Sequence, residues 1–146
     1  MRTRTLKAMM MISILMVLSA LSANAQKGSS FVVKVPFAFT VSGKTLPAGE
    51  YVFARSTQAS GEVMMVRSQE RGAYVQTKPV QAQDIQEETQ VIFKRYGDQY
   101  FLFQIWMSGK SSGRELFKSG REQKSERELA QRALKPETVA IMFQPR

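Results

Sequence analysis

The 146-residue chain contains no cysteine and no histidine. The lack of cysteine excludes disulfides and thiol chemistry, and the lack of histidine removes a common metal ligand and the usual general base. Ser–His–Asp and Cys–His arrangements and histidine-bearing zinc sites are therefore excluded. No catalytic, metal-binding or cofactor-binding motif stands out among the remaining residues. We accordingly expect a protein that is not an enzyme, carries no cofactor and is stabilised by core packing alone.

The N-terminal segment has the three parts of a secretory signal peptide. Residues 2–7 carry Arg2, Arg4 and Lys7 without an acid, residues 8–18 are apolar except for Ser13, and residues 23–25 read Ala-Asn-Ala. We predict a signal peptide over residues 1–25, cleavage after Ala25, and a periplasmic or extracellular location. An uncleaved membrane anchor is the alternative, but the apolar run is shorter than the ~20 residues of a spanning helix.

The expected mature chain, residues 26–146, is basic and has the length of a single domain. It has 18 basic and 12 acidic residues, a net charge of +6. Such a charge promotes encounter with acidic polysaccharide, anionic lipid or nucleic acid. For an exported protein we expect acidic polysaccharide, an anionic lipid surface or an envelope protein as partner, and not nucleic acid.

The first half of this domain alternates in the manner of β-strands. Five apolar residues at period two share one face of a strand that begins at residue 31: Phe31, Val33, Val35, Phe37 and Phe39. Pro36 cannot donate a ladder hydrogen bond, so this strand lies at a sheet edge or bulge. Turn residues at 42–43 and 47–49 predict two sharp reversals. Strands over 51–56, 62–68 and 73–80 then form a meander.

The second half begins with a polar loop over residues 81–90. Strands over 91–96 and 100–108 flank Gly97-Asp98, a pair that suits a two-residue type II′ hairpin. The second of these strands alternates with Phe101, Phe103, Ile105 and Met107 on one face, and Tyr100, Leu102, Gln104 and Trp106 on the other. Both faces are largely apolar, which indicates a central strand covered on both sides.

An amphipathic helix is predicted over residues 122–134, with Ser119 or Ser125 as its N-cap and Pro136 as its stop. Its apolar stripe consists of Leu129, Ala130, Ala133 and Leu134. A last strand follows over residues 138–143. The fold class is therefore all-β: a small antiparallel β-barrel or sandwich of about eight strands with one C-terminal amphipathic helix followed by a last strand. An outer-membrane barrel is an alternative, although most of these strands are shorter than the ~9–11 residues it needs.

Basic residues gather around the predicted hairpin and the start of the helix. They form our candidate anion-binding set: Lys94, Arg95, Arg114, Lys118, Arg121 and Lys124. Tyr96 and Tyr100 are near them in sequence, and basic side chains interleaved with aromatic ones bind polyanions. The alternative is a solvated surface on which Arg114 and Arg121 pair with neighbouring acids. The leading functional hypothesis is a non-enzymatic module that binds an anionic macromolecule or envelope surface.

Two further hypotheses come from other residues. A barrel cavity lined by Tyr51, Phe53, Leu102 and Trp106 would make the protein a carrier of a small apolar ligand, whereas a filled core is the alternative use of these side chains. The acids of the polar loop, Asp84, Glu87 and Glu88, could supply a hydrolase pair, but adjacent loop acids are usually only solvated charges.

Two segments carry a resemblance to known sequences. They are VPFAFTVSGKTLPAGEYVF (residues 35–53) and FKRYGDQYFLFQIWMSGKSSGREL (residues 93–116). In these the chain resembles a family of small exported bacterial β-rich proteins. The resemblance implies a discrete exported domain. No activity is assigned to that family, so it implies no functional residues.

Overall fold

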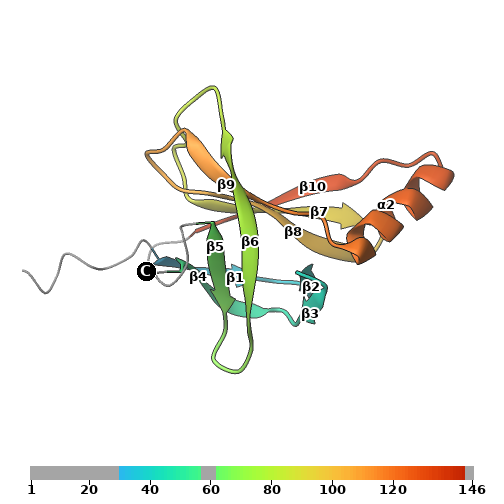
Figure 1. Cartoon of the computed structure of the whole chain (residues 1–146), viewed down its shortest axis with the longest axis horizontal. Helices are drawn as coiled ribbons and strands as arrows, with labels where there is room; N and C mark the ends of the chain where they lie inside the picture. Colours follow the sequence, from blue (N-terminus) through green and yellow to red (C-terminus); the bar gives the residue numbers. More distant parts are fainter. Residues whose placement is uncertain (1–29, 57–61, 144–146) are drawn as a thin grey trace, which may run out of the picture.

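The computed structural model describes residues 30–56 and 62–143, so the predicted signal peptide lies outside the described residues. Among these residues strands dominate, with one short helix near the C-terminal end of the fold (Figure 1). The elements in chain order are β1 (Ser30–Val35), β2 (Phe39–Val41), β3 (Lys44–Leu46), β4 (Gly49–Arg55), β5 (Val63–Arg67), β6 (Gly72–Gln81), β7 (Gln90–Tyr96), β8 (Gln99–Trp106), β9 (Ser112–Leu116), α2 (Gly120–Gln131) and β10 (Glu137–Met142). The predicted fold class, all-β with a late helix and a last strand, is confirmed.

All ten strands belong to one open sheet that bends at β6. The first half of β6 pairs with β5, and its second half pairs with β9. One part of the sheet therefore runs β1-β4-β5-β6 and the other runs β6-β9-β8-β7-β10, with every pair antiparallel. The short β2–β3 hairpin joins β8 through a parallel pair. The edges β1 and β10 approach each other where the rings of Phe31 and Phe143 lie 6.4 Å apart, centroid to centroid.

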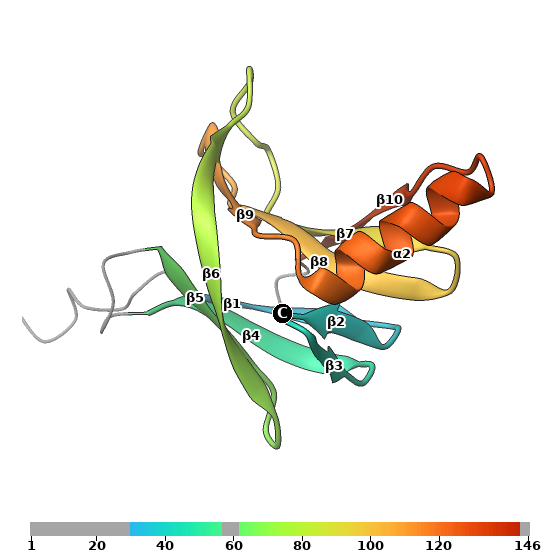
Figure 2. The ribbon, with the colours of Figure 1, turned by 45° about the vertical axis from the view of Figure 1, so that its right-hand side comes forward.

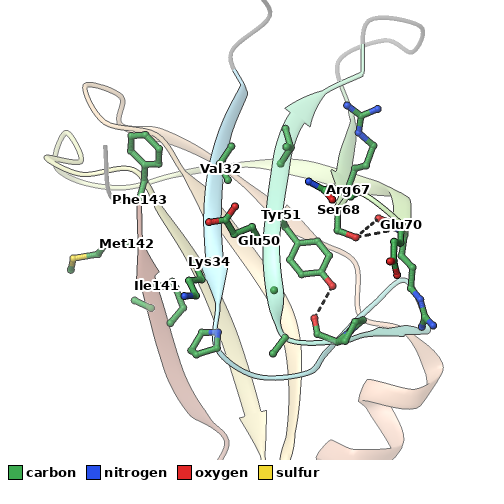
Figure 3. Close-up of a pocket in the computed structure, with 18 residues that line it drawn as sticks. Val32, Lys34, Glu50, Tyr51, Arg67, Ser68, Glu70, Ile141, Met142 and Phe143 are labelled. Atoms are coloured by element: carbon green, nitrogen blue, oxygen red, sulfur yellow. Dashed lines mark hydrogen bonds between the residues drawn. The ribbon is translucent and has the colours of Figure 1, made fainter. Parts of the chain in front are cut away.

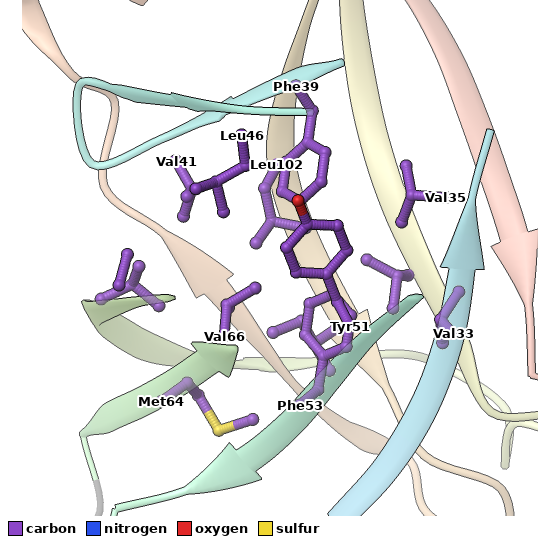
Figure 4. Close-up of a cluster of buried hydrophobic side chains, with 14 of the residues drawn as sticks. Val33, Val35, Phe39, Val41, Leu46, Tyr51, Phe53, Met64, Val66 and Leu102 are labelled. Carbon is purple, nitrogen blue, oxygen red and sulfur yellow. The ribbon is translucent and has the colours of Figure 1, made fainter. Parts of the chain in front are cut away.

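The core lies on the concave side of this bent sheet and is built from the predicted period-two positions. Phe31, Val33 and Val35 of β1 are buried. The ring of Phe39 meets the rings of Tyr51 and Phe93 edge-on, with centroids 5.0 and 5.3 Å apart (Figure 4). Such edge-to-face contacts add to the free energy gained from apolar burial.

The predicted first strand is two strands separated by residues 36–38. Pro36 ends the ladder of β1, which is a sheet edge as expected. Phe37 is half-buried and packs against the core, with its ring stacked on Tyr100 at 3.8 Å between centroids. Before the interruption the chain pairs with β4, and after it the chain pairs with β8. The apolar side chains point inward on both sides of the interruption.

The hairpin around Gly97-Asp98 is confirmed. Gly97 has φ +65, whereas Asp98 is not among the residues with positive φ, as a type II′ turn requires. At the β2–β3 turn both Ser42 and Gly43 have positive φ, +48 and +77. This matches a type I′ turn, the tightest reversal compatible with strand twist.

A β-bulge in β8 makes the predicted alternation of this strand wrong beyond Leu102. Phe93 pairs with Leu102, whereas Ile92 pairs with Gln104, so Phe103 has no partner across the ladder. The extra residue brings Leu102 and Ile105 into the same core, although simple alternation puts them on opposite faces. Both faces of β8 are nevertheless covered, as expected for a central strand.

Helix α2 covers the outer face of the β7–β8 hairpin and is shorter than predicted. Ser119 is the N-cap, and its hydroxyl accepts a hydrogen bond from the Glu122 backbone N–H at 3.2 Å. Leu129 is buried against Tyr96 and Phe101. Ala130 is exposed within the helix, and Ala133 and Leu134 are exposed beyond its end at Gln131, where Ala133 adopts φ +55 ahead of Pro136. Within the described residues, no helix has the length and apolarity required to cross a membrane.

Candidate functional site

A buried carboxylate–phenol pair positions α2 on the sheet. Glu122 is 5% exposed, and the Tyr96 hydroxyl donates a hydrogen bond to its Oε1 at 3.1 Å. Burial raises the pKa of Glu122, against the opposing effects of the Tyr96 hydrogen bond and of the Lys118 and Lys94 charges. Burial, followed by the Glu122 charge, raises the pKa of Tyr96 well above its usual range. The phenol therefore stays protonated and holds the helix against β7.

The structure does not gather the six predicted anion-binding residues into one surface. Lys94 lies over the Phe103 ring, with its Nζ 4.0 Å from the centroid. Lys118 Nζ is 2.7 Å from Glu126 Oε1. Both cations lie near Glu122, where their charges act on its carboxylate. Their main partners are thus within the protein.

Three of the six residues lie elsewhere. Arg95 pairs with Glu137 of β10 at 3.3 Å, and Arg121 donates to the Thr45 hydroxyl at 3.0 Å. Arg114 is half-buried, and its register partner Ile105 places it on the core side of β9. Burial and the Arg55 charge lower the pKa of Arg114, and its Nε has no hydrogen-bond partner in the described part of the chain.

The aromatic side chains expected beside these cations are not free for stacking on a ligand. Tyr96 is buried beneath α2. Tyr100 is half-buried, and Phe37 stacks on its ring. A polyanion would therefore meet cationic side chains and backbone here, without an aromatic platform.

The exposed side of α2 and the segment that follows it present four cations, which we call the α2 basic face. Its members are Lys124, Arg127, Arg132 and Lys135, all exposed. One of them, Lys124, belongs to the predicted anion-binding set. Helical periodicity places Lys124 and Arg127 opposite the buried Glu122 and Leu129. Figure 2 shows the helix running along the outside of the sheet towards the connection with β10.

Few acids neutralise the α2 basic face. Lys124 Nζ lies 4.0 Å from Glu128 Oε1, at the outer limit of an ion pair. Among the described residues, Arg127, Arg132 and Lys135 form no ion pair. Only Lys124 of this face was predicted from the sequence. A signal for Arg127 was available, because no acid lies three or four residues away on either side: Gln123, Lys124, Ala130 and Gln131 occupy those positions.

The four residues predicted to line an apolar cavity do not line one together. Tyr51, Phe53 and Leu102 are packed within the core, and the Tyr51 hydroxyl donates to the Pro47 carbonyl at 2.7 Å. Trp106 lies on the other side of β8, where its Nε1 donates to Gln104 Oε1 at 3.1 Å. A filled core is therefore the use that the structure makes of these side chains.

The acids of the polar loop are exposed, namely Asp84, Glu87 and Glu88. The Ser108 hydroxyl donates to the Glu87 carbonyl, so this loop is tied to the end of β8 through its backbone. No group of three or more potential metal ligands occurs among the described residues.

An open groove of about 1480 Å³ lies on the outer side of β1 and β4 (Figure 3). It extends from the β5–β6 turn, residues 68–71, to the end of β10. Val32, Val52 and Met142 contribute apolar lining, and Tyr51 is the only predicted cavity residue among those that line it.

Comparisons of the chain with protein-family models, with curated proteins and with solved structures give no match. The resemblance to a family of small exported proteins therefore stays a prediction.

Proposed function

We propose that the protein is an exported, non-enzymatic binding module that holds an anionic polymer, such as an acidic polysaccharide of the envelope, against the α2 basic face. The observation that carries this proposal is the exposure of four cations, of which, among the described residues, only Lys124 lies within 4.0 Å of an acid, Glu128. Two other acids of the helix are occupied, because Glu122 is buried and Glu126 pairs with Lys118.

The geometry supports a preorganised surface. Ser119 caps the start of α2, while Tyr96 and Leu129 hold its inner side against the hairpin. Lys124 and Arg127, which lie on the helix held in this way, lose less conformational freedom on binding than cations on a loose segment, and Arg132 and Lys135 follow directly after the helix end at Gln131. Two of the four are arginines, whose planar guanidinium groups form paired hydrogen bonds with sulfate, phosphate or carboxylate oxygens.

The proposal is tested with heparin as the probe polymer, by calorimetric titration at low ionic strength. In one variant Arg127, Arg132 and Lys135 are changed together to glutamine. We expect its affinity to fall by at least about tenfold, because three charge-assisted contacts are removed.

A matched control removes the same charge from other places. In this variant Lys34, Arg67 and Lys110, all exposed, are changed to glutamine. The control should bind nearly as well as the unchanged protein. Equal losses in the two variants would show that heparin senses only net charge, and the proposal would then be abandoned.

The two other functions predicted from the sequence have less support. A carrier of a small apolar ligand needs an internal cavity, whereas Tyr51, Phe53 and Leu102 fill the core. A hydrolase needs two carboxylates in contrasting environments, whereas Asp84, Glu87 and Glu88 are all exposed on one loop.

A further inference from the structure

Four strands carry an apolar outer face that we call the β1–β6 outer face. Its members come from β1, β4, β5 and β6, namely Val32, Val52, Ala54, Met65 and Tyr74. The strand register makes them neighbours, since Val32 pairs with Val52, and Met65 pairs with both Ala54 and Tyr74. Tyr74 is 67% exposed and Val32 is 40% exposed.

This face differs from the usual outer face of an antiparallel sheet, which is polar where it meets water. On the other half of the sheet, α2 covers the outer side of β7 and β8. On this half, the groove of about 1480 Å³ leaves Val32 and Val52 open, with the exposed Met142 at one end (Figure 3). Two members of the face, Val32 and Tyr74, are exposed, and the other three are half-buried. A contiguous apolar surface of this kind marks an interaction site.

The charges around this face select its partner. The groove is bordered by three cations, Lys34, Arg67 and Arg71, and by two acids, Glu50 and Glu70. This part of a basic molecule is therefore close to neutral and presents both signs. Two copies related by a twofold axis can place Arg67 or Arg71 of one copy near Glu70 of the other, and the reverse contact follows by symmetry.

We propose that the partner is a second copy of this chain, with the two β1–β6 outer faces packed against each other as in a β-sandwich. An anionic membrane or polymer is a poorer match, because a surface of one sign cannot pair with both Arg67 and Glu70. Four strands spaced by ~4.8 Å give a face only about 15 Å wide, which is the scale of a weak and reversible dimer. This inference does not depend on the α2 basic face, which lies on the other half of the sheet.

The first test is sedimentation equilibrium of the mature chain, without any polymer, over about a thousandfold range of concentration extending into the millimolar range. We expect a monomer–dimer equilibrium whose Kd rises at least tenfold on Tyr74→Glu. The matched control is Ile85→Glu, which places the same charge on a side chain of equal exposure, 66%, in the β6–β7 loop. This control should leave the Kd unchanged.

The second test uses the absence of cysteine from the chain, because a single introduced thiol can only pair between copies. Under mild oxidation, Tyr74→Cys should form a covalent dimer at a rate at least tenfold above that of Ile85→Cys. A chain that stays monomeric throughout, or a dimer insensitive to Tyr74→Glu, overturns the proposal. Binding of monomers to phosphatidylglycerol vesicles that is lost on Tyr74→Glu would also overturn it, since the face would then be a lipid site.

Discussion

Among the glycines that the structure describes, Gly113 is the position at which one added methyl group should cost the most. It is buried in β9, and a Cβ built on it would lie 2.5 Å from Cε3 and 2.6 Å from Cδ2 of Trp106. The indole cannot move away freely, because its Nε1 donates a hydrogen bond to Gln104 Oε1. The Gln104 side-chain amide in turn donates a hydrogen bond to Glu115 at 2.8 Å. Glu115 also holds Lys78 of β6 at 2.9 Å. A shift of the ring therefore disturbs a chain of contacts that crosses three strands.

We expect Gly113→Ala to lower the free energy of unfolding by about 2–4 kcal/mol. Overpacking costs ~1–3 kcal/mol, and a weakened Trp106–Gln104 hydrogen bond adds ~0.5–1.5 kcal/mol. For a domain of this size the melting temperature should fall by roughly 4 °C per kcal/mol. Trp106 is the only tryptophan, so its fluorescence during urea unfolding reports directly on the site.

A double-mutant cycle checks the cause. In a Trp106→Ala background the methyl group meets open space, so Gly113→Ala should cost less than ~0.5 kcal/mol. If Gly113→Ala changes stability by less than ~0.5 kcal/mol in the unchanged protein, and the emission maximum stays the same, the packing argument is refuted.

Three other predictions concern the helix and a turn. Burial raises the pKa of Glu122 in the folded protein above its ordinary value of 4.5. Protonated Glu122 therefore contributes its full stabilisation of the fold below pH 4.5, and this contribution is lost as the pH rises through the pKa of the folded state. The Glu122→Gln variant keeps a hydrogen-bond acceptor for Tyr96 but cannot ionise. In urea titrations, the free energy of unfolding of this variant should therefore increase with pH relative to that of the unchanged protein. A difference between the two proteins that does not change with pH would contradict this. In thermal unfolding, Leu129→Ala should lower the free energy of unfolding by ~2–4 kcal/mol and Leu134→Ala by less than ~0.5 kcal/mol, because only Leu129 is buried. Equal losses in the two variants would refute the packing assigned to α2. Gly43→Ala should lower the free energy of unfolding by ~1 kcal/mol, because an alanine at φ +77 strains the backbone even though no atom lies within 4 Å of the added carbon. An unchanged melting temperature would disprove this.

Local pattern was sufficient to predict most elements. The period-two runs of β1, β4 and β7, the Gly97-Asp98 turn and the Ser119 cap all depend on residues close in sequence. The bulge at Phe103 was not predictable in this way, because no glycine marks it and it follows from the pairing of β8 with β7. The early end of α2 also lacks a local signal, since an alanine, Ala133, adopts the left-handed conformation that usually favours glycine.

The candidate site was harder to predict than the fold, because charge partners depend on register and bending. Arg95 and Glu137 are 42 residues apart and meet only because β10 pairs with β7. Arg114 alternates with Glu115 along β9, and nothing in its sequence neighbourhood shows which of the two faces the core. Sequence proximity thus grouped six cations, of which the structure places Lys94 and Lys118 near Glu122, whereas Arg95 and Arg114 have other surroundings.

The salt dependence of heparin binding tests the central claim most directly. For a linear polyanion, log K falls with log salt by roughly 0.7–0.9 for each cation in contact. The variant with Arg127, Arg132 and Lys135 changed to glutamine should therefore lose about two to three units of this slope, whereas the control with Lys34, Arg67 and Lys110 changed should keep it. An unchanged slope in the first variant would contradict the assignment of the α2 basic face.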